Sequence, residues 1–164
     1  MVLDQYNTQP EIIKVSEHHI NKQIIDKHAK SIIYQLNESG FEAFIVGGFV
    51  RDSILGLKPK DCDVVTNATP EEIKNAIPRT RIIGRRFKIV HARAGRNIIE
   101  ISTFRSSGKS NIKKSHKGIL IRDNNYGNIE DDAFRRDFTI NSLYLDVKPV
   151  SYTHLRAHET VLDL

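Results

Sequence analysis

A pair of glycines and a pair of aspartates stand close together in this chain. Gly47-Gly48 ends an apolar run, and Asp61 and Asp63 follow it with Cys62 between them. Backbone N–H groups beside glycine can approach an anion closely, because no Cβ stands in the way. Aspartates two positions apart on a strand point to one face of a sheet, where they can bind Mg²⁺. Two such acids are ordinarily a solvated strand end, but the nearby glycines favour a phosphate cradle beside a two-metal site, and hence nucleotidyl transfer.

Arg51-Asp52 lies between these pairs, in residues 49–55, which we expect to form a short helix. Arg51 could hold a phosphate with two guanidinium nitrogens. Alternatively, both residues are ordinary exposed helix residues. Because adjacent positions do not face each other on a helix, we expect at most one of them to point into the cleft.

Glu100 lies in the alternating segment 98–103, where Ile99 and Ile101 are expected to face the core. Glu100 would then face the other way, toward the aspartate pair. It could be a third carboxylate, serving the metals or the attacking hydroxyl. An exposed strand residue is the competing interpretation.

Two basic clusters could also bind phosphate. Arg135-Arg136-Asp137 precedes an apolar stretch and suits phosphate binding, or else forms a salt-bridged helix surface. Arg85-Arg86 could follow an RNA backbone or neutralise a triphosphate, although charge runs are usually only solvated. The same alternatives apply to other basic residues around them, namely Arg79, Arg81, Lys88, Lys109, Lys113, Lys114 and Lys117.

The composition fits one ordinary domain or a piece of a larger protein, with 164 residues and 39% hydrophobic residues. The formal net charge of +5 is compatible with a polyanionic partner. A single cysteine, Cys62, excludes an internal disulfide and indicates a reducing compartment, so we expect a cytoplasmic protein. No apolar run is long enough for a membrane span, and the N-terminus does not resemble a signal peptide.

The apolar periodicity predicts an ordered set of elements around these residues. We expect an extended lead-in at residues 1–15, an irregular loop at 106–118 and a helical segment at 129–147. Helices are expected at 16–39, 49–55 and from Thr69 to before Pro78, and strands at 41–46, 61–65, 82–83, 88–93 and 98–103.

Residues 150–164 are expected not to belong to the natural protein. The run VSYTHLRAHET resembles a translated adapter from transposase-based DNA sequencing libraries. The alternative is a genuine polar segment whose histidines, His154 and His158, are spare. If the tail is foreign, the natural sequence was interrupted near Pro149, and His154 and His158 should not be considered metal ligands.

Four motifs together resemble the head domain of class II nucleotidyltransferases of the polymerase-β superfamily, which include bacterial poly(A) polymerases and tRNA CCA-adding enzymes. The motifs are residues 47–52, 61–63, 100–105 and 135–141. Residues 84–88 and 121–130 resemble the poly(A) branch more than its CCA-adding relatives. The resemblance implies an α+β fold with a small mixed sheet backed by helices, over residues 16–149.

The resemblance also implies an activity and a set of site residues. The activity is transfer of AMP from ATP to an RNA 3′ end with two Mg²⁺ ions. Implied roles are metal binding for Asp61 and Asp63, a catalytic role for Asp137, and nucleotide contact for Gly47, Gly48, Arg51 and Arg136. A CCA-adding enzyme, a non-catalytic RNA-binding module and a fragment that does not fold stably remain alternatives, because the base-selecting region of the family follows this head.

Overall fold

The computed structural model describes residues 11–14, 17–18, 20–85, 87–95, 97–106, 112–114, 120–122, 125–148 and 152–155. Its helices are η1 (Lys22–Ile24), α1 (Lys27–Glu38), α2 (Gly48–Ile54), α3 (Pro70–Ala76), α4 (Ile129–Phe134) and η2 (Thr139–Asn141), where η marks a 3₁₀ helix. Its strands are β1 (Glu11–Lys14), β2 (Ala43–Val46), β3 (Asp63–Thr66), β4 (Thr80–Ile83), β5 (Ile89–Ala94), β6 (Asn97–Thr103), β7 (Ile112–Lys114), β8 (Leu120–Arg122), β9 (Leu143–Leu145) and β10 (Tyr152–Leu155).

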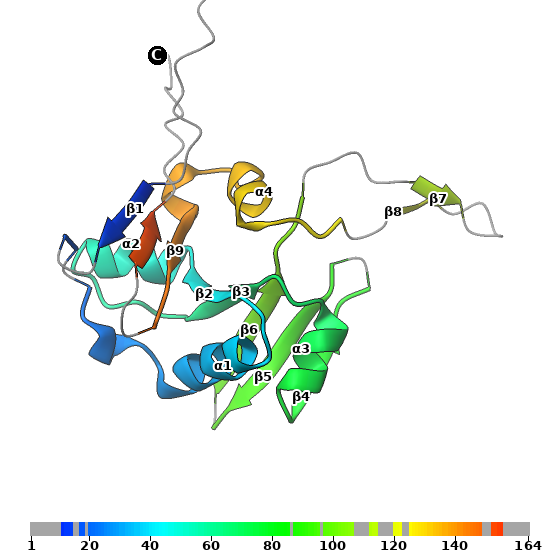
Figure 1. The fold of residues 1–164 in the computed structure, drawn as a ribbon, viewed down its shortest axis with the longest axis horizontal. Helices are drawn as coiled ribbons and strands as arrows, with labels where there is room; N and C mark the ends of the chain where they lie inside the picture. The colour runs from blue at the N-terminus through cyan, green and yellow to red at the C-terminus, as the bar shows by residue number, and fades with distance from the viewer. Residues whose placement is uncertain are drawn as a thin grey trace, which may run out of the picture.

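Eight of these strands form one sheet in the order β1-β10-β9-β2-β3-β6-β5-β4, and β7 pairs with β8 apart from it (Figure 1). β3 and β6 run parallel, whereas the other neighbours in this sheet run antiparallel. The predicted α+β fold with a mixed sheet and helices is therefore confirmed. Within the described ranges, no helix has the length and apolar character needed to cross a membrane.

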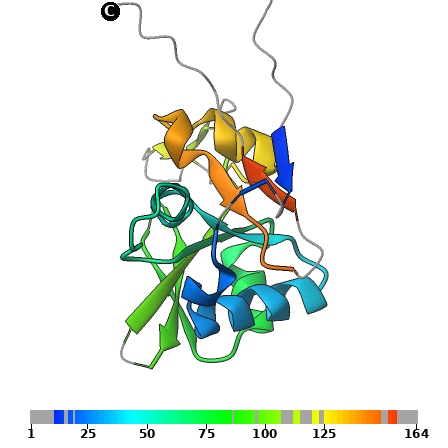
Figure 2. The ribbon, with the colours of Figure 1, turned by 90° about the vertical axis from the view of Figure 1, so that its left-hand side faces the viewer.

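The sheet buries apolar side chains on both faces. Val64 of β3 packs in a core that includes Ile33 of α1 and Ile73 of α3. The next residue, Val65, packs with Ala133 of α4 in a second core. Because successive strand residues point to opposite faces, α1 and α3 cover one face and α4 covers part of the other. Figure 2 shows α1 and α4 on opposite sides of the strands.

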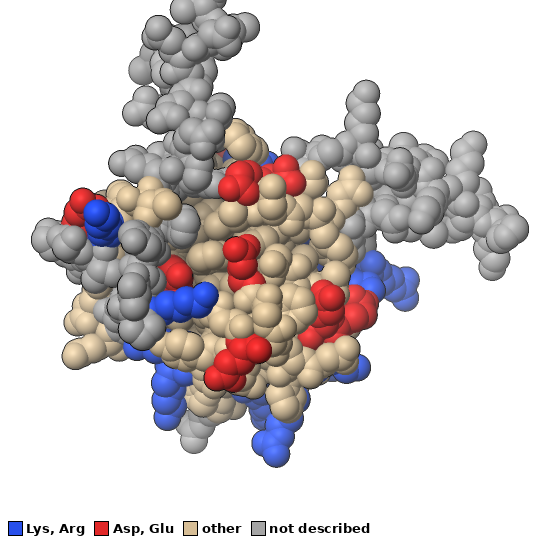
Figure 3. Space-filling view, viewed as in Figure 1, with Lys and Arg blue, Asp and Glu red and all other residues tan. Residues whose placement is uncertain are grey.

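The face that carries α1 and α3 has no single charged patch in view. Figure 3 shows its acidic side chains as separate groups, with Lys and Arg mainly along the rim. A polyanion that binds by charge alone has no obvious site on this face.

Local signals explain where the helices begin and end. α1 begins after Asp26, whose carboxylate accepts the His28 N–H at 2.6 Å, so the predicted start at residue 16 was wrong. Gly40, with a φ of 87°, follows the end of the helix. α3 begins with a capping box between Thr69 and Glu72, at the predicted start of this helix.

Two expectations for the later part of the chain were wrong. Residues 129–147 are not helical throughout, because α4 ends at Phe134 and the chain later enters β9. Tyr144 and Leu145 of β9 pair with β2 and are fully buried, one on each face of the sheet. This long-range pairing outweighs the local helical spacing. β7 also lies within residues 106–118, where we expected no regular structure.

The two ends of the described chain lie side by side. β1, within the segment predicted to be an extended lead-in, pairs with β10, and β10 pairs with β9 (Figure 2). β10 belongs to residues 150–164, and the adapter origin of that segment stays a prediction.

Candidate active site

Asp63 and Glu100 lie next to each other on the sheet face opposite α1 and α3. In the parallel pair of β3 and β6, Val64 lies beside Ile101, and both belong to the core under α1 and α3. Asp63 and Glu100 each precede one of these residues, so both face the other way. The predicted orientation of Glu100 is thus confirmed, while its catalytic role stays a prediction. His91 Nε2 of β5 lies 3.5 Å from Glu100 Oε1.

The electrostatics of Asp63 show that negative charge is concentrated here. Burial raises the pKa of Asp63, the charges of Glu100 and Asp61 raise it further, and Arg136 acts in the opposite direction. Asp61 is exposed and precedes β3, so the strand begins two residues later than predicted. The repulsion among these carboxylates is what a bound cation would relieve.

The donor set fits Mg²⁺ bound together with a phosphate ligand. Asp61 and Asp63 offer only carboxylate oxygens, the type of ligand that Mg²⁺ prefers. In the part of the chain that the structure describes, no group of three or more His, Cys, Asp or Glu side chains is arranged to hold a metal ion. Mg²⁺ commonly takes one or two carboxylates from a protein and completes its shell with phosphate oxygens and water.

Cys62, between the two aspartates, takes no part in this donor set. It packs against the core under α1 and α3. Burial, together with the charges of Asp26 and Asp63, raises the pKa of its thiol to about 12. A neutral thiol is a poor nucleophile and a poor metal ligand, so Cys62 has a packing role.

Gly47 forms the turn that joins β2 to α2. Its φ of 72° and ψ of −129° are rarely adopted by residues with a side chain. Its carbonyl accepts the N–H groups of Val50 and Arg51, and its own N–H donates to the Leu143 carbonyl at 3.0 Å. Because this N–H is already used, Gly47 contributes a turn to the site, and the amides left for an anion are those that follow it.

Arg51 lies over this turn and is held by its own neighbour. Its Nε and Nη2 contact Asp52 Oδ1 at 2.9 and 2.8 Å, and its Nη1 donates to Asn141 Oδ1 at 3.3 Å. The long arginine side chain therefore folds back onto the adjacent carboxylate, while the expectation that at most one of the two residues points into the cleft stays a prediction. A Cβ added to Gly48 would lie 3.5 Å from Arg51 Nη2.

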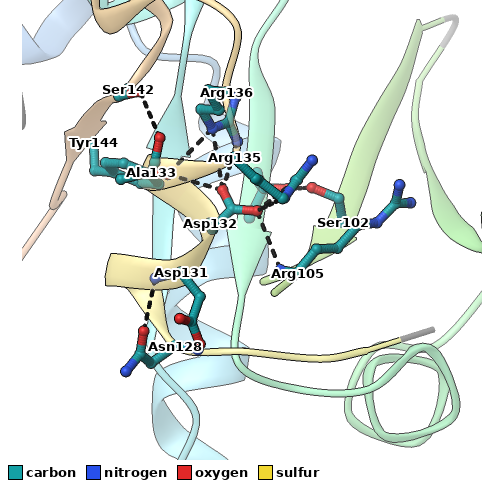
Figure 4. A network of polar contacts seen from close by, with 11 residues as sticks. Ser102, Arg105, Asn128, Asp131, Asp132, Ala133, Arg135, Arg136, Ser142 and Tyr144 are labelled. Carbon is teal, nitrogen blue, oxygen red and sulfur yellow. Dashed lines mark hydrogen bonds and ion pairs between the residues drawn. The ribbon is translucent and has the colours of Figure 1, made fainter. Parts of the chain in front are cut away.

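A buried carboxylate that the sequence analysis did not single out organises the other side of the site (Figure 4). Asp132 is fully buried. Its Oδ1 accepts from Arg135 Nε at 3.0 Å and from the Arg105 backbone N–H at 3.2 Å. Its Oδ2 accepts from Arg136 Nη2 and from the Tyr144 hydroxyl, both at 2.8 Å. The spacing of three and four residues between Asp132 and the two arginines was the signal that could have revealed it.

Arg136 connects this carboxylate to the glycine turn. Its Nε and Nη2 face Asp132, whereas its Nη1 would lie 4.0 Å from a Cβ on Gly47. Its positive charge also acts on Asp63. The ion pairs expected for a salt-bridged helix do occur, but the carboxylate is buried and Arg136 lies beside the site.

The remaining predicted residues lie outside these contacts. Asp137 is exposed, and its side chain makes no hydrogen bond or ion pair with another described residue. Arg85 is exposed between β4 and β5. Arg86, predicted to contact RNA or phosphate, lies outside the described residues.

We expect Gly47→Ala to lower the free energy of unfolding by about 1–3 kcal/mol, because a side chain strains the backbone at positive φ. The new Cβ would meet only ordinary contacts, at 3.9 Å from the Asn141 carbonyl and 4.0 Å from Arg136 Nη1. Gly48→Ala is the matched control, since Gly48 has no positive φ. Urea unfolding of both variants measures the difference, and equal losses would contradict the role of the Gly47 backbone.

Comparison with known proteins gives one consistent result. A family model described as the Poly A polymerase head domain matches residues 43–164. Poly(A) polymerase I of Haemophilus influenzae is 48% identical over 139 residues, which cover 81% of this chain and 31% of that protein. Poly(A) polymerase I of Escherichia coli is 46% identical over 145 residues, which cover 85% of this chain and 31% of that protein.

A solved structure, the Bacillus stearothermophilus CCA-adding enzyme in complex with CTP, is 32% identical with a TM-score of 0.58, over 72% of this chain and 27% of that one. The chain spans about a third of the length of the curated relatives it matches. The matched motifs and the shared sheet place it in one family: the chain belongs to the poly(A) polymerase head domain family.

Proposed function

We propose that this chain is the catalytic head of an RNA adenylyltransferase. The 3′ hydroxyl oxygen of an RNA bonds to the α-phosphorus of ATP, the bond to the β-phosphate oxygen breaks, pyrophosphate leaves, and the hydroxyl loses its proton. The relatives named poly(A) polymerase I support this activity. The observation that carries it is the meeting of Asp63, Glu100 and Asp61 beside a glycine turn flanked by Arg51 and Arg136.

The carboxylates supply the metal site in this proposal. Asp61 and Asp63 hold Mg²⁺, and Glu100 is a third carboxylate on the same sheet face. When bound, Mg²⁺ neutralises phosphate charge and lowers the pKa of the attacking hydroxyl. Asp137 is proposed as a further catalytic carboxylate, because it lies in the family motif at residues 135–141.

The cationic groups position the triphosphate. Arg51 and Arg136 each have one edge of the guanidinium fixed by a carboxylate, which leaves less side-chain freedom to lose on binding. The turn at Gly47-Gly48 lets the phosphates approach the backbone closely. Arg85 and Arg86 are proposed to contact RNA phosphates.

Incorporation of ATP and of CTP by the full-length protein tests this proposal. On an RNA with a free 3′ end, we expect repeated AMP addition that depends on Mg²⁺. A CCA-adding activity is the second candidate, because a CCA-adding enzyme bound to CTP shares the fold at 32% identity. It predicts CTP incorporation on a tRNA that lacks its end, and strong CTP use would overturn the adenylyltransferase proposal.

A non-catalytic RNA-binding module is distinguished by metal dependence. In the adenylyltransferase, Mg²⁺ held by Asp61 and Asp63 would neutralise triphosphate charge, so ATP should bind more tightly when Mg²⁺ is present. A titration of ATP binding against Mg²⁺ that shows no coupling would favour the non-catalytic module. The single cysteine supports a cytoplasmic location as part of this proposal.

On the acidic side, the dependence of activity on pH should follow the ionisation of the Asp63 carboxyl. Burial and then Glu100 raise its pKa, so the ionised form that binds metal is lost on acidification sooner than for an ordinary aspartate. We expect Glu100→Gln to lower the pKa of Asp63 and to shift the acidic limb of kcat/KM to lower pH. His91 Nε2 also lies 3.5 Å from Glu100, so His91→Gln is the control that alters this contact and keeps the Glu100 carboxylate. An unshifted limb in Glu100→Gln would contradict this electrostatic coupling.

A further inference from the structure

A second group of cationic and aromatic side chains lies on the far side of Asp132. Arg105 and Arg135 lie on one side of this carboxylate, whereas Arg136 and Tyr144 lie on the other (Figure 4). The two oxygens of Asp132 therefore serve two different sets of donors. Arg136 lies beside the glycine turn at Gly47, whereas Arg105 and Arg135 lie on the side of Asp132 that faces away from this turn.

On that other side, Arg105 stacks on an exposed aromatic ring. Its Cζ lies 4.8 Å from the centre of the Phe87 ring. Phe87 is 55% exposed, which is unusual for a phenylalanine beside a folded core. The guanidinium covers one part of the ring, while more than half of the residue's surface stays exposed.

A tight turn presents this ring. Gly84 has a φ of 90°, and a Cβ added there would lie 2.3 Å from the Phe87 carbonyl oxygen. Only glycine allows this close approach, so the turn depends on Gly84. The next residue, Lys88, is tied to α3 by an ion pair with Glu71 at 2.6 Å. Phe87 therefore lies in a turn that requires glycine, and its neighbour Lys88 is paired with α3.

The surroundings of Arg105 combine a further aromatic residue with a further cation. Arg105 forms a backbone bridge with Tyr126, which is 39% exposed. Burial lowers the pKa of Arg105, and the neighbouring charge of Arg135 lowers it further. A phosphate would relieve the repulsion between these two guanidinium groups. Aromatic rings interleaved with arginines are the usual platform for single-stranded nucleic acid.

We propose that Phe87, Arg105 and Arg135 bind the single-stranded 3′ segment of the RNA substrate, with a base stacked on Phe87 and a phosphate beside the two arginines. This inference rests on the proposed function, because it assigns the RNA side of the same site. Asp132 then positions the groups for both substrates, with Oδ1 serving the RNA side and Oδ2 the triphosphate side.

The test measures RNA binding separately from catalysis, in the full-length protein without ATP or Mg²⁺. Fluorescence anisotropy follows a labelled oligoadenylate of about ten nucleotides, within the usual site size for single strands. We expect Phe87→Ala to raise the Kd about 5- to 100-fold, as for loss of one stacked base, and Phe87→Trp to restore binding. Arg105→Ala should reduce the salt dependence of log Kd by about one phosphate contact. Tyr34→Ala is the control, since Tyr34 is a 41% exposed aromatic residue of α1, on the other sheet face.

The outcomes separate this inference from the proposed function. An unchanged RNA Kd in Phe87→Ala, in a wild type that adds AMP, would overturn the RNA site alone. A Kd that depends on Phe87, in a wild type that adds no nucleotide, would support the RNA site and overturn the adenylyltransferase. Equal effects of Phe87→Ala on RNA binding and on the KM for ATP, with a lower Tm, would identify a packing role and overturn the inference.

Discussion

Asp63→Asn should abolish AMP incorporation and leave the protein at least as stable as the wild type. Charge neutralisation by a bound metal supplies several kcal/mol, so we expect a loss of about 10³-fold or more in kcat. Burial, Glu100 and Asp61 raise the pKa of Asp63. A carboxyl with a raised pKa contributes stability at low pH and loses it as the pH rises through that pKa. At neutral pH its charge therefore weakens the fold, and asparagine removes the charge while keeping the shape.

Two measurements on the same variant check this result. Incorporation of labelled AMP into RNA reports the activity, and urea unfolding at neutral pH reports the stability. Glu38→Gln is the matched control, because it removes an exposed carboxylate at the end of α1. Normal incorporation by Asp63→Asn would end the metal assignment, and a large loss of stability would show that the fold needs this carboxylate.

Asp132→Ala should produce the largest loss of stability among the site residues, about 3–5 kcal/mol. Asp132 is fully buried and accepts hydrogen bonds from Arg135, Arg136, Tyr144 and the Arg105 backbone. Its removal leaves two partly buried guanidinium groups and a buried hydroxyl without their acceptor. Unfolding in urea measures the loss, and a change below about 1 kcal/mol would contradict the central position of Asp132.

Milder variants and pH sharpen this prediction. Asp131→Ala, one residue earlier, removes only a partner in the capping box of α4. It should lower the free energy of unfolding by about 1 kcal/mol. Burial by itself would raise the pKa of Asp132, but Arg136 and Arg135 hold it below its ordinary value. A lowered pKa gives stability above the unfolded-state value that is lost as the pH falls through the folded-state value. The difference between wild type and Asp132→Ala should therefore shrink in acid.

Several features of the fold and site could be predicted because their causes are local. The capping box at Thr69 and the turn at Gly40 depend on nearby residues. The orientation of Glu100 followed from strand alternation alone, since Ile99 and Ile101 must both be buried. The glycine pair and the aspartates were singled out from local spacing as well, because two glycines in sequence suit a tight turn and aspartates two positions apart share a strand face.

Other features depend on contacts that no short window contains. The Arg51 guanidinium, which pairs with Asp52, also donates to Asn141, ninety positions away. β9 forms in a segment with helical spacing because β2 offers a free edge. Each of these outcomes was decided by partners that only folding brings into reach.

The sequence by itself determined which residue types make up the proposed site, because their spacing along a strand or turn is set by backbone geometry. Only the tertiary structure decided that Asp132 is fully buried and that the Tyr144 hydroxyl and the Arg105 backbone N–H join the two nearby arginines as its donors. The physical reason is that a buried carboxylate needs hydrogen-bond donors around it in place of water. These donors come from the residues just after α4, from β9 and from Arg105, two residues after β6.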